Sequence, residues 1–173
     1  MITLKGDKVY LRALEPEDLE FVTNIENNES LWELSNTQTP FSKYTIKKYI
    51  ENAHRDVYEV KQLRLVISDY HHQGIGLIDL FDFDFKNKRA GVGIILAEPF
   101  QNKGYANEAV TLLTKYSFIH LNLHQLYCNI SEDNDKSIKL FENQGFERIG
   151  LKKDWNLVNK KFKNEYLYQL ILK

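Results

Sequence analysis

A short polar loop, Gln101-Asn102-Lys103-Gly104-Tyr105-Ala106, carries the residue types of an anion-binding site. An apolar run at residues 90–97 precedes this loop, and a helical pattern begins at Asn107. A helix N-terminus offers unpaired backbone N–H groups and a partial positive charge. Gly104 would let the backbone approach a phosphate closely, and Lys103 would add a cation. The loop therefore predicts a site for a phosphorylated ligand.

The glycines near this loop bear on a simpler alternative, in which Gly104 only helps the chain turn from strand to helix. Gly91 and Gly93 lie on one face of the strand that leads into the loop. Glycine weakens a strand interior and often marks a close approach of a ligand or backbone, so the pair favours a ligand site. The loop matches neither the P-loop pattern nor the dinucleotide-binding pattern, which indicates a phosphate loop of another kind.

A second motif lies downstream, Asn134-Asp135-Lys136-Ser137-Ile138-Lys139-Leu140-Phe141-Glu142-Asn143-Gln144-Gly145-Phe146. It resembles the Asn-x-x-Ser/Ala helix ending in Gly-Phe of the GNAT superfamily of acyl-CoA-dependent N-acyltransferases. The loop Gln101-x-x-Gly104-x-Ala106 resembles the diphosphate-binding signature of the same family. The resemblance covers nearly the whole chain and is greatest to the branch of spermidine and ribosomal-protein-alanine acetyltransferases. It implies acetyl-CoA as a co-substrate.

The resemblance also implies which residues hold acetyl-CoA. A backbone N–H of the Ile94-Ile95-Leu96 stretch would polarise the thioester carbonyl, because this strand splays from the next one in the family. The other residues expected at the cofactor are Gln101, Asn102, Lys103, Gly104, Tyr105, Ala106, Asn134, Lys136, Ser137 and Phe141.

Transfer to an amine needs the amine in its neutral form, although a lysine-like amine has a pKa near ~10.4. Asp79 is the candidate general base, because strand alternation places it among Ile75, Leu77 and Phe81, where a charge needs a partner. An acceptor amine or a relayed water could be that partner. The alternative, left open by the sequence, is a structural Asp79 satisfied by a buried arginine or a backbone N–H.

Two further residues are candidates for binding the acceptor. Asp82 lies on the same hairpin as Asp79 and could draw in a cation. Strand alternation places it on the opposite face near the turn, which also suits a solvated side chain. Trp32 falls in the connection between the first two helices, which forms one wall of the acceptor site in the family. It is equally compatible with a core anchor, and for Phe41 in the same connection we favour the core.

Two positions depart from the family pattern. Some relatives have a proton-relaying glutamate where this chain has Gly91, and many have a tyrosine that protonates the departing thiolate where this chain has Phe141. A phenyl ring cannot donate a proton. A thiol with a pKa near ~8.5 is nevertheless a tolerable leaving group, and Ser137 or a water could replace the acid. Phe141 is therefore expected to pack on the cofactor and not to catalyse.

The elements that position these residues follow from periodicity. We expect strands at 8–12, 63–67, 75–83 and 126–130, with residues 63–83 forming a hairpin. Helices are expected from Glu15-Pro16 to Asn27-Asn28, after a cap at Ser42, at 107–121 and after Asn134. A closing hairpin is expected from strands at 146–158 and 165–172. This order predicts a mixed α/β sheet with a parallel pair at its centre, and the resemblance implies the α/β GNAT fold, mostly antiparallel with helices on both faces.

Composition limits the class of protein. The 173 residues fit one domain spanning 1–173, with 43% hydrophobic and 27% charged residues. A net charge of −1 argues against a nucleic-acid partner, and the apolar runs are too short for a membrane span. The lone Cys128 cannot form an internal disulfide and suits a reducing cytoplasm. No metal site is expected, because the adjacent His71 and His72 would point to opposite sides of an extended chain.

These observations predict a cytoplasmic acetyl-CoA-dependent N-acetyltransferase whose acceptor is a small cationic amine, with diamines or polyamines first. One alternative is acetylation of protein N-termini. Another, favoured by Phe141 and Gly91, is an acyl-CoA-binding module without catalysis. The sequence does not set the oligomeric state, and a homodimer is kept beside a monomer.

Overall fold

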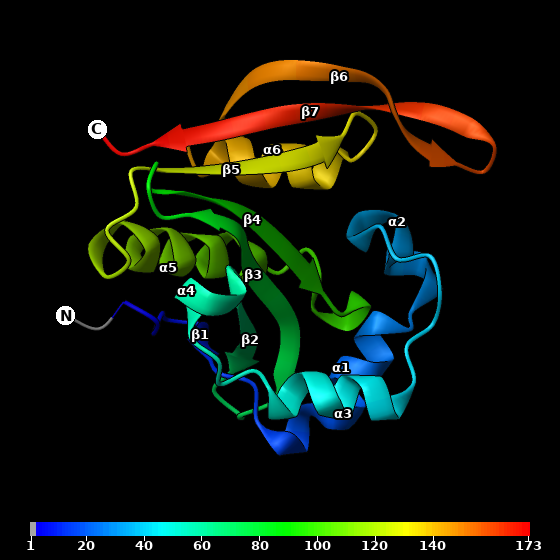
Figure 1. The fold of residues 1–173 in the computed structure, drawn as a ribbon, viewed down its shortest axis with the longest axis vertical. Coiled ribbons are helices and arrows are strands. Elements are labelled where there is room, and N and C mark those ends of the chain that lie inside the picture. The colour runs from blue at the N-terminus through cyan, green and yellow to red at the C-terminus, as the bar shows by residue number, and fades with distance from the viewer. Residues whose placement is uncertain (1–2) are drawn as a thin grey trace.

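A seven-stranded sheet organises the computed structural model, which describes residues 3–173. The strands are β1 (Val9–Arg12), β2 (Leu63–Asp69), β3 (Gly74–Asp84), β4 (Arg89–Leu96), β5 (Gln125–Ser131), β6 (Glu147–Val158) and β7 (Lys161–Ile171). Their order in space is β1-β2-β3-β4-β5-β7-β6, and only β4 and β5 are parallel to each other. Figure 1 shows β5, β6 and β7 set apart from β1–β4. The predicted mixed sheet with a central parallel pair is confirmed.

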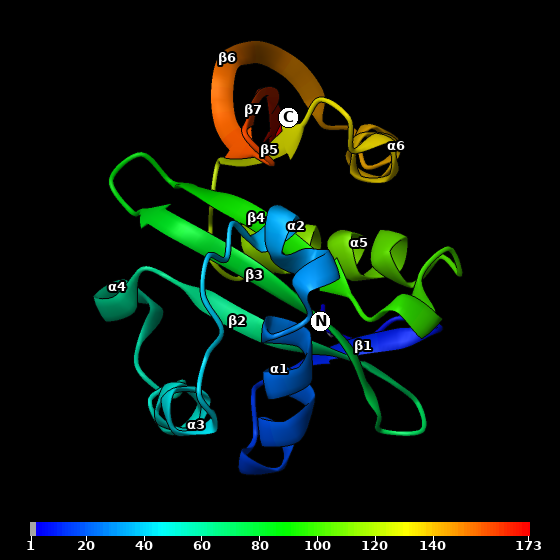
Figure 2. The ribbon, with the colours of Figure 1, turned by 90° about the vertical axis from the view of Figure 1, so that its right-hand side faces the viewer.

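Helices cover both faces of this sheet. The helices are α1 (Leu19–Glu26), α2 (Trp32–Ser35), α3 (Lys43–Glu51), α4 (Val57–Val60), α5 (Tyr105–Ile119) and α6 (Asp135–Asn143), with short 3₁₀ turns at Pro16–Asp18, Glu29–Leu31 and Glu98–Phe100. Figure 2 shows α1 and α3 together below the sheet, with α5 and α6 on the other side. None of the helices in residues 3–173 is long and apolar enough to cross a membrane.

Strand alternation divides the core between the two faces. Val66 and Leu77 pack with α1 and α3, whereas the neighbouring Ile67 and Ile78 pack with α5. Leu113 of α5 is 1% exposed, and burying such a side chain stabilises the fold by roughly 1.5–3 kcal/mol. The apolar stripes read from the sequence therefore hold each helix on its own face of the sheet.

The parallel pairing of β4 with β5 covers only three residues of β4, so part of the β4 edge is left unpaired. Only Arg89, Ala90 and Gly91 of β4 pair with β5, while β4 pairs with β3 as far as Leu96. From Val92 to Leu96, no strand in the described chain bonds the β5-facing edge of β4. The two strands therefore diverge, as the family resemblance implied, and they leave backbone groups free along one edge.

Local signals set several element ends. The Ser42 side chain accepts a hydrogen bond from Thr45 N at 3.1 Å, which confirms the predicted helix cap. Gly145 has a φ of +84° after α6, the left-handed conformation expected at a helix C-terminus. Helix α5 begins at Tyr105, two residues before the predicted start.

The closing hairpin differs from the prediction at one strand. Strand β7 begins at Lys161 and not at Glu165. Asn159 and Lys160 both have positive φ, so they form a two-residue turn whose twist matches the flanking strands. Pairing can therefore start directly after the turn, at Val158 and Lys161.

Candidate active site

The phosphate loop joins the end of β4 to α5 and is fixed at three points. The Gln101 side chain donates from Nε2 to Leu96 O at 3.1 Å, which ties the loop to the strand. Gly104, with a φ of +84°, forms the N-cap of α5, and Lys8 Nζ donates to Lys103 O at 3.4 Å. A Cβ at Gly104 would lie 3.2 Å from Lys8 Nζ. The loop is thus held with the helix N-terminus open to a ligand.

Helix α6 forms the opposite side of a cleft of about 370 Å³. Asn134 caps this helix by accepting from Ser137 N at 3.1 Å, and Lys136 Nζ lies 3.4 Å from Gln101 Oε1. The cleft is lined by Leu31, Leu34, Ile94, Ile95, Leu96, Gln101, Asn102, Gly104, Ala106, Asn107, Asn134, Lys136, Ser137, Leu140 and Asn143. A free strand edge at one end and a helix N-terminus at the other suit a long amide-bearing arm joined to phosphates.

A second cavity of about 680 Å³ lies on the α1–α3 side of β4. The two cavities share Leu34, Ile94 and Ile95 in their linings, so they adjoin along these residues. The second cavity is lined by Val22, Ile25, Glu26, Leu34, Ser35, Asn36, Thr37, Phe41, Thr45, Ile46, Tyr49, Gln62, Arg64, Leu77, Asp79, Phe81, Val92, Gly93, Ile94, Ile95, Asn129 and Glu165. We call it the acceptor cavity.

Arg64 of β2 organises the charges of the acceptor cavity. It donates from Nε and Nη2 to the two oxygens of Asp79, at 2.6 and 3.0 Å, and from Nη1 to Glu26 Oε1 at 2.6 Å. The Tyr49 ring covers the guanidinium, with its centroid 5.4 Å from Cζ. Burial alone would lower the pKa of Arg64, but the charge and hydrogen bonds of Asp79 raise it above the usual value. Arg64 is therefore a permanent cation between two carboxylates.

The far wall of the acceptor cavity comes from β5 and β7. Glu165 accepts from Lys152 Nζ at 2.5 Å on one oxygen and from Asn156 Nδ2 at 2.8 Å on the other. Lys152 also donates to Asn129 Oδ1 at 2.9 Å.

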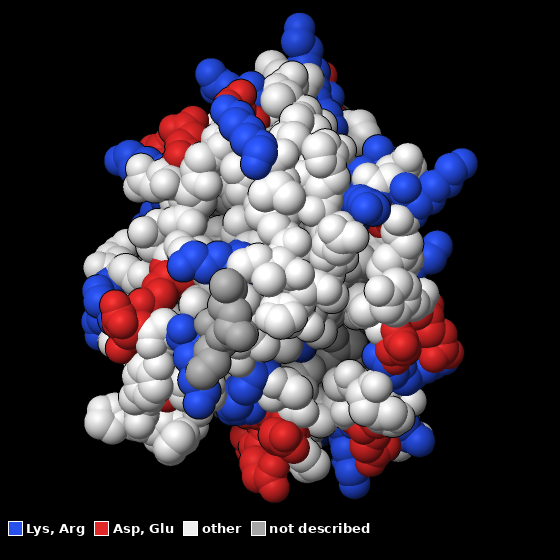
Figure 3. Space-filling model, turned by 90° about the vertical axis from the view of Figure 1, so that its left-hand side faces the viewer, with Lys and Arg blue, Asp and Glu red and all other residues white. Residues whose placement is uncertain are grey.

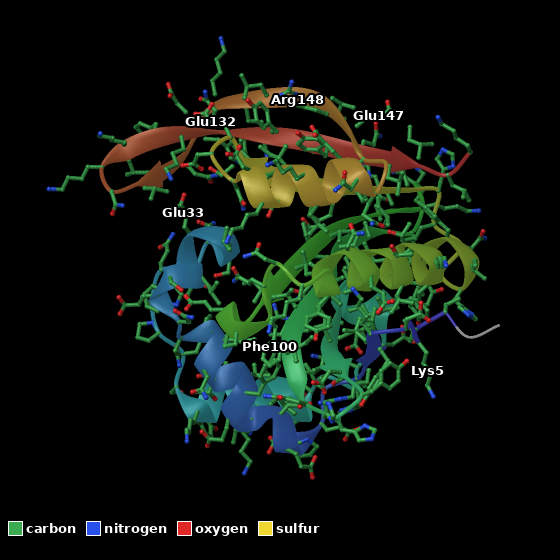
Figure 4. The ribbon with its side chains drawn as sticks, turned by 180° about the vertical axis from the view of Figure 1, so that it is seen from behind. Lys5, Glu33, Phe100, Glu132, Glu147 and Arg148 are labelled. Carbon is green, nitrogen blue, oxygen red and sulfur yellow. The ribbon has the colours of Figure 1, made fainter. Side chains whose placement is uncertain are left out.

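A salt bridge on this side joins β7 to the α2 wall of the acceptor cavity. Lys163 of β7 lies 2.5 Å from Glu33 of α2, and Figure 4 shows Glu33 below the end of the β6–β7 hairpin. The bridge therefore holds α2 against the C-terminal hairpin.

Comparison with known proteins decides the family. Residues 8–147 match the family model described as an acetyltransferase (GNAT) domain. The chain is 30% identical to spermidine N(1)-acetyltransferase of Vibrio cholerae over 84% of this chain and 82% of that protein. It is 28% identical to the Escherichia coli K12 enzyme of the same name, over 90% and 82% of the two chains. This chain belongs to the GNAT acetyltransferases.

Solved structures agree with this assignment. A crystal structure of the Vibrio cholerae spermidine N-acetyltransferase in complex with CoA and spermine superposes with a TM-score of 0.88, at 27% identity and 96% coverage of both chains. The GNAT fold and acetyl-CoA-dependent N-acetyltransferase activity follow for this chain. Acetyl-CoA is the co-substrate.

Most residues predicted at the cofactor line the cleft of this GNAT enzyme. Ile94, Ile95, Leu96, Gln101, Asn102, Gly104, Ala106, Asn134, Lys136 and Ser137 all do so. Lys103 and Tyr105 do not. The Lys103 ammonium lies instead 5.7 Å from the Phe100 ring centroid, and the Tyr105 ring lies near the same ring. Both side chains therefore lie at the Phe100 ring and outside the cleft.

Phe141 is not a lining residue of the cleft, which corrects the expectation that it packs on the cofactor. Its side chain is 3% exposed and contacts the Phe146 ring edge to face, with centroids 5.1 Å apart. The apolar face of α6 faces the sheet, and Phe141 lies on that face among core residues.

Of the three residues predicted to bind the acceptor, only Asp79 lines the acceptor cavity. Asp79 lines the acceptor cavity with both oxygens bonded to Arg64, which is the arginine partner that the sequence left open. Asp82 does not line the cavity, because a register shift after Phe81 turns it outward with a φ of +49°. Trp32 is also absent from the lining and donates from Nε1 to Glu26 O at 2.8 Å, so it supports the end of α1.

Three expectations about apolar and glycine positions are corrected or refined. Phe41 lines the acceptor cavity and is 38% exposed, so it is not a core anchor. Gly91 gives room to the Phe81 ring rather than to a ligand, because a Cβ there would lie 2.3 Å from that ring. Gly93 does line the acceptor cavity.

Sequence reasoning missed Glu26, Arg64, Tyr49 and Glu165. A charged residue inside the apolar strand Leu63–Ile67 was a usable signal for Arg64, because a buried cation needs a partner. The other three lie in segments whose exposure and direction depend on how distant elements meet.

Proposed function

We propose that this GNAT enzyme acetylates a diamine or polyamine by direct attack of one primary amine on the thioester of acetyl-CoA. The junction of the two cavities at Leu34, Ile94 and Ile95 carries this proposal, since an amine in the acceptor cavity can meet the thioester there. The spermidine N-acetyltransferase relatives and the CoA–spermine complex support the same acceptor class.

The lining of the acceptor cavity suits an acceptor of this class. Methylene segments match the apolar wall formed by Val22, Ile25, Phe41, Ile46 and Leu77. The carboxylates of Glu26, Asp79 and Glu165 exceed the two cations that pair with them, Arg64 and Lys152, by one negative charge. A cationic amine would restore neutrality inside a partly buried site.

We propose that a free N–H on the edge of β4 between Ile94 and Leu96 polarises the thioester carbonyl. Asp79 remains the predicted base for the attacking amine. It is the cross-strand neighbour of Gly93, next to the junction, and each of its oxygens accepts one Arg64 hydrogen bond, which leaves a second lone pair on each oxygen for a proton.

The test is release of CoA thiol over a panel of acceptors at fixed acetyl-CoA. We expect kcat/KM to be highest for spermidine, spermine or an α,ω-diamine, with little turnover of peptides bearing a free N-terminus. Turnover of the peptides alone would replace this proposal with protein N-terminal acetylation.

That second candidate has one observation in its favour. The Bacillus subtilis protein YdaF, provisionally named a ribosomal N-acetyltransferase, is 29% identical over 99% of this chain. Location in the cytoplasm, one domain over residues 1–173 and a homodimer also stay predictions, the last testable by light scattering.

A further inference from the structure

The charge network of the acceptor cavity has one open position. Asp79 accepts two hydrogen bonds from Arg64, and Glu165 accepts one on each oxygen from Lys152 and Asn156. Glu26 accepts from Arg64 on Oε1 alone. In the described chain nothing donates to Glu26 Oε2, and the side chain is 14% exposed on the cavity wall.

This open oxygen is accessible and held in place. No buried side-chain oxygen within residues 3–173 lacks a hydrogen-bond partner, so Oε2 must reach the solvent of the cavity. The Arg64 Nη1 bond fixes the carboxylate group, and the Tyr49 ring covers one side of the guanidinium. A carboxylate whose rotation is already restricted binds a cation with a smaller loss of entropy.

Glu26 and Asp79 lie on different sides of the Arg64 guanidinium. Asp79 is the cross-strand partner of Gly93, beside the junction of the two cavities. Glu26 binds a different edge of the same guanidinium and projects from the end of α1. A cation on Glu26 Oε2 would lie on the α1 side of the guanidinium, whereas the attacking amine is proposed to lie at Asp79.

We propose that Glu26 is a specificity-determining residue that binds the non-reacting ammonium of the acceptor. This rests on the proposed function, because it requires an acceptor with at least two amines. The distal amine stays protonated at neutral pH, since its free pKa is near ~10.4, and it can donate to Oε2. The site then selects diamines and polyamines over monoamines of equal length.

The experiment compares 1,5-diaminopentane with n-pentylamine and measures kcat and KM for each. In Glu26→Gln the side-chain oxygen can still accept from Arg64, but the charge is gone. We expect the preference for the diamine in kcat/KM to fall at least ~10-fold, through KM, a factor worth about 1.4 kcal/mol. Glu26→Asp, which retains the charge, should retain part of the preference.

The matched control is Glu165→Gln, which removes the same charge from the same cavity at a carboxylate whose two oxygens are already engaged. It should lower kcat/KM for both amines by the same factor and leave their ratio in place. An unchanged ratio in Glu26→Gln, or an equal change in both variants, overturns the inference alone. If the wild-type enzyme acetylates neither spermidine nor the diamine, the proposed function fails and the inference falls with it.

Discussion

The cofactor cleft and the acceptor cavity meet at three residues but are built in different ways. The cleft consists largely of two continuous segments, the loop from Gln101 to Asn107 and the start of α6 at Asn134, together with a free strand edge. The acceptor cavity takes side chains from α1, α2, α3, β2, β3, β4, β5 and β7. A site formed by backbone groups of one segment is recorded in a motif, whereas a site formed by side chains of many segments is not.

The two regions also treat charge differently. The cleft offers backbone N–H groups and the Lys136 ammonium to phosphates, and the acceptor cavity holds acids around Arg64. On the outer face seen in Figure 3, lysine and arginine are interspersed with aspartate and glutamate around a broad uncharged centre. The two cavities thus differ in the sign of the charges they present, whereas this outer face mixes both signs.

The largest effect is expected at the cleft, from Gly104→Glu. The new side chain meets a left-handed backbone and places a negative charge where phosphates bind. We expect no thermal shift with acetyl-CoA and no measurable turnover. Gly104→Ala, which adds strain without charge, should lose less.

Gly150→Glu is the matched control for Gly104→Glu. It adds the same side chain on β6, where a Cβ has no neighbour closer than 4.0 Å, and it should bind acetyl-CoA normally. A folded Gly104→Glu protein that keeps the full thermal shift would refute the assignment of the phosphate loop.

On the acceptor side, Asp79→Asn is expected to lower turnover at least ~100-fold while acetyl-CoA still binds, the low end for losing a general base. Raising the pH should partly restore the rate, because more of the acceptor amine is then neutral. A loss that is equal at every pH, with a lower Tm, would assign Asp79 to holding Arg64 instead.

Asp82→Asn is the control for Asp79→Asn on the same strand. Its side chain lies outside the cavity, so turnover should stay within about twofold of the wild type, as for most surface substitutions. Full activity of Asp79→Asn would mean that the base lies elsewhere.

Phe141→Tyr tests whether the Phe141 ring belongs to the core or reaches the cofactor cleft. Because the ring is 3% exposed and packs on Phe146, the added hydroxyl would be buried, which costs about 1–3 kcal/mol for a hydroxyl without a hydrogen bond. We expect a lower Tm and an unchanged kcat, measured by thermal unfolding and thiol release. Phe162→Tyr, at a site 62% exposed, should leave the Tm in place. A higher kcat in Phe141→Tyr would show that the hydroxyl reaches the thioester.

The smallest effect concerns the support beneath the phosphate loop. Burial would raise the pKa of Glu108, but hydrogen bonds from the backbone N–H groups of Asp7, Lys8 and Val9 hold it below its usual value. A carboxyl with a depressed folded pKa stabilises the protein above its unfolded pKa of ~4.3 and loses that contribution as the pH falls through the folded value. Glu108→Gln should therefore lower the Tm at pH 7.

The pH series supplies the check on Glu108. The difference in Tm between Glu108→Gln and the wild type should shrink as the pH falls from the unfolded value of ~4.3 through the lower folded pKa. A difference that stays constant from pH 7 to pH 3 would exclude this linkage.

Prediction from sequence succeeded where the signal is local. The cap at Ser42, the cap at Gly145 and the strand–loop–helix around Gly104 each depend on neighbours within a few residues. At Lys103, Tyr105 and Phe141 the family pattern identified the segment but not the direction of each side chain, which lies outside the cleft. Tyr105 and Phe141 lie in helices, and a helix turns 100° per residue, so its start position decides which of its side chains face the ligand.

The sequence by itself determined the family, the co-substrate and the order of the elements, because these depend on continuous motifs and on hydrophobic period. Only the tertiary structure decided that Arg64 joins Asp79 to Glu26, that Trp32 and Asp82 lie outside the acceptor cavity, and that Phe41 lines it. Glu26 and Asp79 are far apart in the chain, and they share a guanidinium only because α1 packs across β2 and β3. A contact between side chains of distant segments is set by packing geometry, which no local pattern contains.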